Sequence, residues 1–200
     1  MPFQQQCDEL RKLYNTYNGT QDVMDLRYLF ALCLRIRHGR RMPWADTRKA
    51  VDKLINSNII NKQFTDFEAL FAEVVGLLKG IQFAQGPLSV YDTALNIGIL
   101  FGIYPQKYIY LNAGARIGAD ALMGRTNVKP IMDVSVWQTP NYFPGVDSMY
   151  IEDILCVFKD VFVKMSKGHT ITTNDVDLYF KPCSLKTFHR DYALKRMGYI

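Results

Sequence analysis

Residues 80–87 form a glycine- and proline-containing turn between two stretches whose apolar residues recur with helical spacing, and this turn most constrains the fold. It reads Gly-Ile-Gln-Phe-Ala-Gln-Gly-Pro, and a second glycine-containing turn follows at 112–118. Proline suits the first turn of a helix because the N–H that it lacks would have no intrahelical partner there. Pro87 therefore predicts the start of a helix that a short turn joins to the helix before it.

Apolar residues at three- and four-residue steps predict further helices on both sides of this turn. Thr20 or Asp22, and Thr65 or Asp66, are candidate N-caps because their side-chain oxygens can accept from backbone N–H groups of a first helical turn. The predicted helices span residues 3–17, 20–36, 43–56, 65–80, 87–104, 114–123 and 149–167. Helices therefore account for most of the chain.

These elements predict a mainly α fold, a multi-helix single domain over residues 1–200 with little or no β structure. Residues 108–111 are predicted to be extended or a helical turn, and residues 176–180 a short strand or helix. The stretch 130–147 combines prolines with aromatic residues, which predicts an ordered loop and marks the one candidate sub-boundary.

The composition is that of a folded globular protein, since 48% of the 200 residues are apolar and 22% are charged. The first residues lack the pattern of a secretory signal, and no apolar run approaches the roughly 18 residues of a membrane span. We therefore expect a cytoplasmic protein with no membrane partner. The four cysteines are dispersed and the three histidines lack metal-binding spacing, so we expect reduced thiols, no metal site and no cofactor.

The net charge of +5 permits an anionic partner. Four arginines fall within residues 35–41, and a second basic stretch at 181–196 is interleaved with aromatic residues, a composition that suits phosphate contacts and base stacking. Two structural interpretations compete. Cations are favoured at a helix C-terminus, and the second stretch can be an amphipathic helix whose long side chains reach solvent. The candidate nucleic-acid-binding residues here are Arg37, Arg40, Arg41 and Lys186.

Three short motifs lie between residues 70 and 129. They are Gly-Pro-Leu at 86–88, Val-Tyr-Asp-Thr-Ala at 90–94 and Gly-Ala-Arg-Ile-Gly-Ala at 114–119. With them the region resembles helix-hairpin-helix proteins and, more narrowly, a group of uncharacterised bacterial proteins. The resemblance implies a helix-hairpin-helix-like element and contact with DNA, and Gly86 and Arg116 in these motifs are further candidate binding residues.

The chain departs from the usual Gly-hydrophobic-Gly hairpin, because residues 83–86 read Phe-Ala-Gln-Gly and keep only the second glycine. Glycine adopts positive φ without a Cβ penalty, so losing one restricts how closely the backbone approaches a phosphate.

We therefore predict non-sequence-specific binding of DNA or RNA through the hairpin turn and the basic stretches. A first alternative is a protein-interaction or assembly module that uses Trp137, Tyr142 and Phe143 as an apolar contact patch. A second is a DNA-glycosylase-like enzyme, because helix-hairpin-helix glycosylases place an essential Asp after the hairpin and Asp120 is the only acidic residue between Asp92 and Asp133. Phosphate-loop, nucleophile-elbow and zinc-protease motifs do not occur, so no catalytic residue is assigned.

Overall fold

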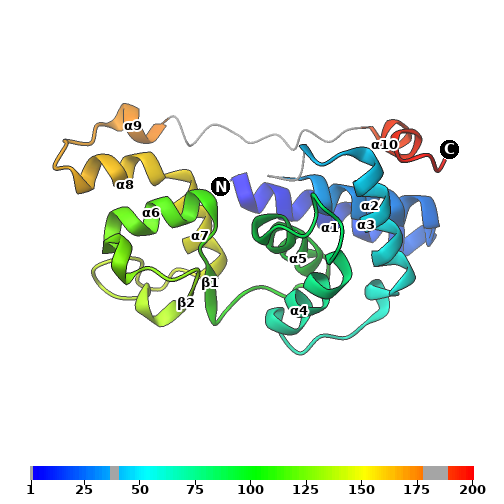
Figure 1. Ribbon diagram of the computed structural model, residues 1–200, viewed down its shortest axis with the longest axis horizontal. Coiled ribbons are helices and arrows are strands. Elements are labelled where there is room, and N and C mark those ends of the chain that lie inside the picture. The colour runs from blue at the N-terminus through cyan, green and yellow to red at the C-terminus, as the bar shows by residue number, and fades with distance from the viewer. Residues whose placement is uncertain (1, 37–40, 178–188) are drawn as a thin grey trace. The chain divides into compact units, whose positions relative to one another are not determined.

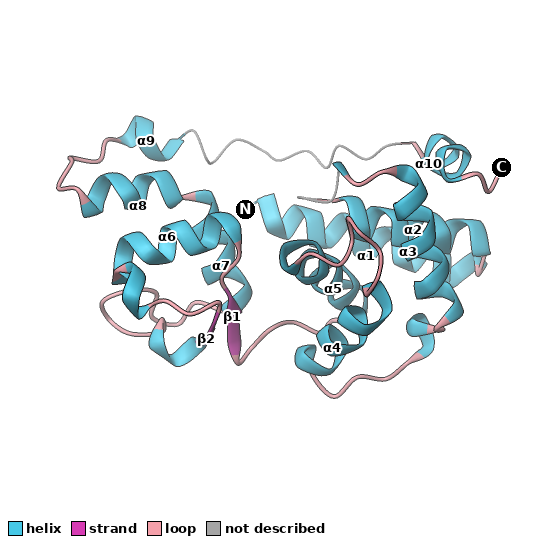
Figure 2. Ribbon diagram, viewed as in Figure 1, coloured by secondary structure: helices cyan, strands magenta, loops and turns pink. Residues whose placement is uncertain are grey.

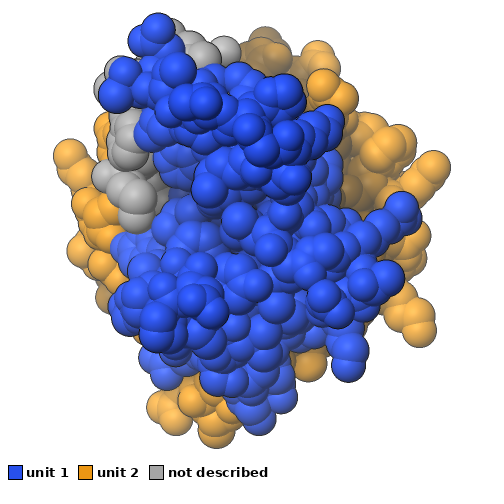
Figure 3. All heavy atoms as spheres, turned by 90° about the vertical axis from the view of Figure 1, so that its left-hand side faces the viewer, with its two compact units in different colours: residues 1–3, 105–183 blue, residues 4–104, 184–200 orange. Residues whose placement is uncertain are grey.

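The computed structural model of the protein describes residues 2–36, 41–177 and 189–200. These residues form ten α-helices and one two-stranded sheet (Figures 1 and 2), which confirms the predicted mainly α fold with little β structure. The chain divides into two compact units, coloured separately in Figure 3. Unit 1 comprises residues 1–3 and 105–183, and unit 2 comprises residues 4–104 and 184–200. The loop 130–147 lies inside unit 1, and a single domain over 1–200 stays a prediction.

Unit 2 is a helical body whose centre is formed by its second and fifth helices. Its elements are α1 (Pro2–Thr20, with residues from 4 onward in unit 2), α2 (Val23–Arg35), α3 (Trp44–Asn56), the 3-10 turn η2 (Ile59–Asn61), α4 (Phe67–Leu78), α5 (Pro87–Phe101) and α10 (Arg190–Met197). Every residue of α5 from 90 to 100 is buried. Most of these residues are apolar, as is typical of a helix buried on all sides, and Asp92, Thr93 and Asn96 are the buried polar exceptions.

The helix boundaries in unit 2 follow local capping chemistry. The Asp22 side chain accepts from Met24 N–H at 2.7 Å and begins α2. The Asp66 side chain accepts from Ala69 N–H at 2.8 Å and begins α4. Gly102, with a φ of 70°, ends α5 in the left-handed conformation that glycine adopts most easily. The two N-caps agree with the candidates predicted from the sequence, whereas α5 ends at Phe101, before the predicted end at 104.

Unit 1 joins a small sheet to four helices. Its elements are β1 (Tyr108–Tyr110), α6 (Ala113–Met123), the 3-10 turn η3 (Arg125–Asn127), β2 (Ile131–Asp133), the 3-10 turn η4 (Val134–Val136), α7 (Ser148–Val157), α8 (Lys159–Ser166) and α9 (Thr173–Asp177). The strands pair antiparallel, with Ile109 opposite Met132. The extended alternative for residues 108–111 is therefore correct, whereas β2 was not predicted.

Trp137 lies in the core of unit 1 and is inaccessible to solvent. Its ring is 6.2 Å from that of Phe143 and 5.5 Å from that of Tyr142, and both neighbours are partly buried against the same core. The stretch 130–147 is ordered as predicted, but its first part forms β2 and η4 instead of loop. The expectation that Trp137 forms part of an exposed contact patch is wrong, because the loop folds its largest apolar side chain inward.

Helix α6 approaches α7 closely through its glycines. A Cβ at Gly118 would overlap the backbone carbonyl of Leu155, and one at Gly114 would overlap the Sγ of Cys156. The predicted long helix at 149–167 is instead two helices, α7 and α8, which meet at Phe158 with φ −94° and ψ 14°. Both contact α6, which the change of direction permits. Across the described ranges, no helix is both long and apolar enough to cross a membrane.

Candidate nucleic-acid interface

Helix α10 packs against α2 and α3 and separates its residues into an apolar side and a basic side. Ala193, Leu194 and Met197 are buried against unit 2. Lys195 and Arg196 are exposed. The described part of the C-terminal basic stretch is therefore the amphipathic helix that one sequence interpretation proposed, with its cations on the solvent side.

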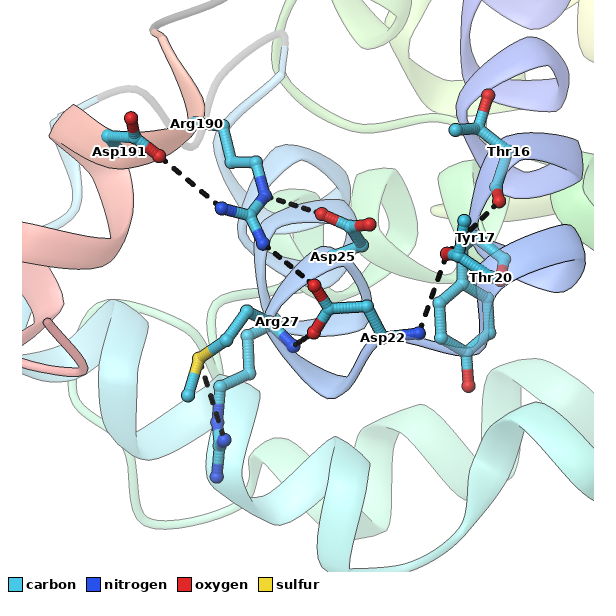
Figure 4. A network of polar contacts seen from close by, with 9 residues as sticks. Thr16, Tyr17, Thr20, Asp22, Asp25, Arg27, Arg190 and Asp191 are labelled. Atoms are coloured by element: carbon cyan, nitrogen blue, oxygen red, sulfur yellow. Dashed lines mark hydrogen bonds and ion pairs between the residues drawn. The ribbon is translucent and has the colours of Figure 1, made fainter.

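Arg190 anchors the beginning of α10 to the beginning of α2, as Figure 4 shows. Its Nη2 lies 3.1 Å from Asp22 Oδ2, its Nε donates to Asp25 Oδ1, and its Nη1 donates to Asp191 Oδ1 at 3.3 Å. The hydrogen bond to Asp25 is the main reason that the pKa of the Arg190 guanidinium is raised. The charge of Arg190 is thus engaged within unit 2.

Tyr199 anchors the other end of the C-terminal segment. The Arg27 guanidinium lies 4.3 Å from its ring centre and the Arg48 guanidinium lies 5.1 Å from it, at the distance of cation–π contacts. The Tyr199 hydroxyl donates to Asp52 Oδ1 at 2.5 Å. Burial, followed by the contact with Asp52, raises the pKa of Tyr199 above the ordinary value. These contacts use both the ring and the hydroxyl.

Arg35 and Arg41, the first and last arginines of the stretch 35–41, do not lie on one exposed surface. Arg35 is buried, donates to Thr47 Oγ1 at 3.0 Å and to the Met42 carbonyl, and lies 3.9 Å above the ring of Trp44. Burial lowers the pKa of its guanidinium from the ordinary value. Arg41 is exposed. The first arginine therefore holds α2 to α3, whereas the last faces solvent.

Trp44 and Tyr192 join the two basic regions. Their rings are 5.9 Å apart and nearly perpendicular, and Tyr192 remains 52% exposed. The charge of Arg196 and the phenol of Tyr192 both influence the pKa of Arg35, so both side chains lie within electrostatic range of it. We call this surface the basic-aromatic face and define it as Arg41, Trp44, Tyr192, Lys195 and Arg196.

The cations of this face differ from the ion-paired basic residues of unit 2. Within the described ranges no ion pair engages Arg41, Lys195 or Arg196. Three other exposed cations of unit 2 have acidic partners, Arg48 with Asp52, Lys49 with Asp46 and Lys62 with Glu73. Lys12, Lys53 and Lys79 are exposed and, like the cations of this face, have no ion pair among the described residues. Among the residues that the structure describes, the positive charge of the basic-aromatic face therefore has no ion-pair partner.

The other predicted site residues are not brought to this face by the described structure. Arg37, Arg40 and Lys186 lie outside the described residues. Arg116 belongs to unit 1, where its Nε lies 2.9 Å from Asp120 Oδ1 on the next turn of α6. This ion pair gives both side chains a partner within α6.

The turn 80–87 joins two packed helices, α4 and α5, as the sequence predicted. Gly80 has a φ of 84°, and its N–H donates to Gln85 Oε1 at 2.9 Å. Gly86 is the N-cap of α5 with a φ of −66°, and nothing lies within 4 Å of the position of a Cβ there. The glycine with left-handed backbone is therefore Gly80, and the backbone conformation does not require glycine at 86.

Unit 1 has a hollow of about 400 Å³ beside β2. It is lined by Met123, Asn127, Lys129, Ile131, Met132, Asp133 and Val136. The Asp133 carboxylate accepts from the N–H and the hydroxyl of Ser135, which lowers its pKa. Among the residues that the structure describes, no three His, Cys, Asp or Glu side chains gather as a metal site would need.

Sequence reasoning noted Tyr192 within its basic stretch but missed its contact with Trp44. The two residues are separated by most of the chain, so no local pattern signals the pair. The spacing of Tyr192 and Arg196, four residues apart, could have indicated that they share one side of a helix.

Comparison of the chain with known proteins finds no matching family model, no matching curated protein and no matching solved structure.

Proposed function

We propose that the protein binds nucleic acid without strong sequence readout, and that unit 2 contacts the phosphates through its basic-aromatic face. The observation that carries this proposal is the set of exposed cations, Arg41, Lys195 and Arg196, with no acidic partner among the described residues. Cations of this kind release the counterions of a phosphate backbone when they bind it, which favours association.

The aromatic pair beside these cations supports a polynucleotide over a simple anion. Trp44 and Tyr192 place ring surface next to Arg196, and interleaved rings and cations suit a ligand that alternates bases with phosphates. The hairpin turn is the second part of the proposal. The N-cap of α5 is Gly86, which has no side chain to accept from the first N–H groups of the helix, and these groups can bind a phosphate.

The test is fluorescence anisotropy with labelled DNA and RNA, single-stranded and duplex, over a range of salt concentrations. Each phosphate contact contributes about 0.9 to the slope of log affinity against log salt for duplex DNA and about 0.7 for a single strand. We expect the variant with Arg41→Ala, Lys195→Ala and Arg196→Ala to have a slope shallower by roughly 2 to 3.

A matched control removes the same charge from unit 1. Arg125, Lys129 and Lys167 are exposed there, and their replacement by Ala should leave the slope near that of the wild type. Equal losses in both variants would show that net charge alone drives binding and would contradict the assignment to the basic-aromatic face. Absence of binding at low salt would refute the nucleic-acid proposal itself.

The protein-interaction alternative is supported by Tyr142 and Phe143, which are only partly buried. Its signature is self-association or partner binding that rising salt does not weaken, because apolar contact dominates. Sedimentation of the wild type at low and high salt tests it. Dissociation by salt would count against this alternative.

A further inference from the structure

We propose that the basic-aromatic face selects an unpaired nucleic-acid strand, with Tyr192 as the ring on which a base stacks and with Arg41, Lys195 and Arg196 on the adjoining phosphates. This inference rests on the proposed function and specifies its ligand. A face that read only phosphates would accept duplex and single strand alike. The additional observation is the exposed ring in the middle of the cations.

Tyr192 is held in place, yet open. Its neighbours Ala193 and Leu194 are fully buried, so the α10 backbone beneath the ring is fixed to unit 2. The rings of Tyr192 and Trp44 meet nearly at right angles, edge to face. Tyr192 is still half exposed to solvent. A fixed, exposed ring can take a base without the entropy cost of ordering a mobile side chain.

Trp44 contacts the ring of Tyr192 and is itself held by Arg35. The Arg35 guanidinium covers one part of the Trp44 ring at 3.9 Å and is itself bonded to Thr47. Arg35, Trp44 and Tyr192 therefore form a continuous series of contacts, which begins at the buried Arg35 and ends at the exposed Tyr192 with two nearly perpendicular rings.

The cations lie where a strand would need them. Arg196 is four residues after Tyr192, which places their Cβ atoms about 6 Å apart on one side of α10. Arg41 lies in the segment before α3 and immediately precedes Met42, whose carbonyl accepts from Arg35. Positive charge thus accompanies the ring on α10, and Arg41 adds an exposed cation on the segment that leads to Trp44.

An unpaired strand satisfies this arrangement and a duplex does not. The π-faces of duplex bases are stacked on their neighbours, whereas a single strand can turn one base onto a protein ring. Stacking of this kind tolerates every base, which agrees with a protein that does not read sequence. An acidic polypeptide could meet the cations but has no base to stack on Tyr192.

The experiment compares binding of three labelled probes, each about 20 units long, a length that exceeds the site of one single-strand-binding domain. The probes are oligothymidine, its duplex with oligoadenine, and polyglutamate as the acidic polypeptide. The variants are Tyr192→Leu, which removes the ring, and Tyr192→Phe, which restores it without the hydroxyl. Tyr17→Leu on α1 is the matched control for losing a half-buried tyrosine. Circular dichroism and thermal unfolding establish that each variant keeps α10 folded.

We expect the wild type to prefer oligothymidine to the duplex. Tyr192→Leu should weaken oligothymidine binding by about 5- to 150-fold, the range that one stacked base accounts for. Its salt slope should stay unchanged because no phosphate contact is lost, and its duplex affinity should change less than twofold. Tyr192→Phe should recover oligothymidine binding, and Trp44 fluorescence should respond to oligothymidine in the wild type.

Four outcomes would overturn the inference. Oligothymidine binding that Tyr192→Leu leaves intact, or a loss that is equal for duplex and single strand, would remove Tyr192 from base stacking while the proposed function stands. Polyglutamate binding as tightly as oligothymidine at equal charge would identify an acidic polypeptide as the partner. Absence of binding to either nucleic acid at low salt would refute the proposed function together with the inference.

Discussion

The two sides of the C-terminal segment use arginine and tyrosine in opposite ways. On the anchored side, Arg190 is bonded to Asp22 and Asp25, and Tyr199 is bonded to Asp52 (Figure 4 shows the Arg190 contacts). On the open side, Arg196 has no ion-pair partner among the described residues and Tyr192 is half exposed. Residue type therefore does not tell which arginine or tyrosine of this segment is available to a ligand. The acidic side chains that lie within bonding distance of each residue decide its availability.

The largest effect is expected from a substitution that loosens the packing of α10 against α2 and α3. Leu194 is fully buried, so Leu194→Ala should destabilise the docked segment by about 2 to 5 kcal/mol through lost burial and a cavity. Hydrogen exchange of the amides in α10 should accelerate, and the basic-aromatic face should lose its ligand with it. Exchange at the wild-type rate would show that the apolar side of α10 contributes little to docking.

A smaller effect separates the Arg190 contacts from the apolar contacts. Arg190→Ala should destabilise docking by roughly 1 kcal/mol, since the side chain is partly exposed and solvent screens its ion pairs. The loss should shrink as salt rises, unlike that of Leu194→Ala. Arg190→Lys is the control, because a single ammonium cannot reproduce the two-sided contact with Asp22 and Asp25. Full stability in Arg190→Lys would mean that charge alone suffices.

Alkaline pH should sharpen the comparison through Tyr199. Its pKa is raised above the ordinary 10.0, so the folded state favours the protonated phenol. The contribution of this group to docking is complete below pH 10.0 and is lost as pH rises above that value. Burial also raises the pKa of Tyr28, so phenolate absorbance should show one late-titrating tyrosine fewer in Tyr199→Phe than in the wild type. Identical titration in the two proteins would contradict the buried contact with Asp52.

The smallest expected change in stability belongs to the open side. Replacing Arg41, Lys195 and Arg196 by Ala should change the free energy of unfolding by no more than about 0.5 kcal/mol, because surface side chains without partners contribute little. The same variant is expected to lose the most nucleic-acid affinity. A large loss of stability would show that these cations hold the fold and would weaken the proposed interface.

The helices of the fold were predictable because their signals are local. Asp22, Asp66 and Pro87 mark helix starts through hydrogen bonds or a ring within one turn of the chain. Strand β2 was missed because a three-residue strand has no periodicity of its own and depends on β1, more than twenty residues earlier. The division of 149–167 at Phe158 was missed for a related reason, since both halves pack against α6.

The candidate site was only partly predictable. The basic stretches and Arg41 came from composition, whereas the burial of Arg35 on Trp44 and the contact of Trp44 with Tyr192 join residues that are distant in sequence. The inward position of Trp137 likewise depends on neighbours that the loop meets only when folded. Each of these contacts decides whether the side chain is buried in the fold or exposed to a ligand.

The sequence by itself determined the helical class, most helix boundaries and the presence of two basic stretches, because backbone hydrogen bonds, caps and formal charges depend on residues a few positions apart. Only the tertiary structure decided which arginines are neutralised, which rings are buried and which tyrosine remains open to a ligand. Burial and ion pairing arise when segments distant in the chain exclude water from one another, and no local pattern records those contacts.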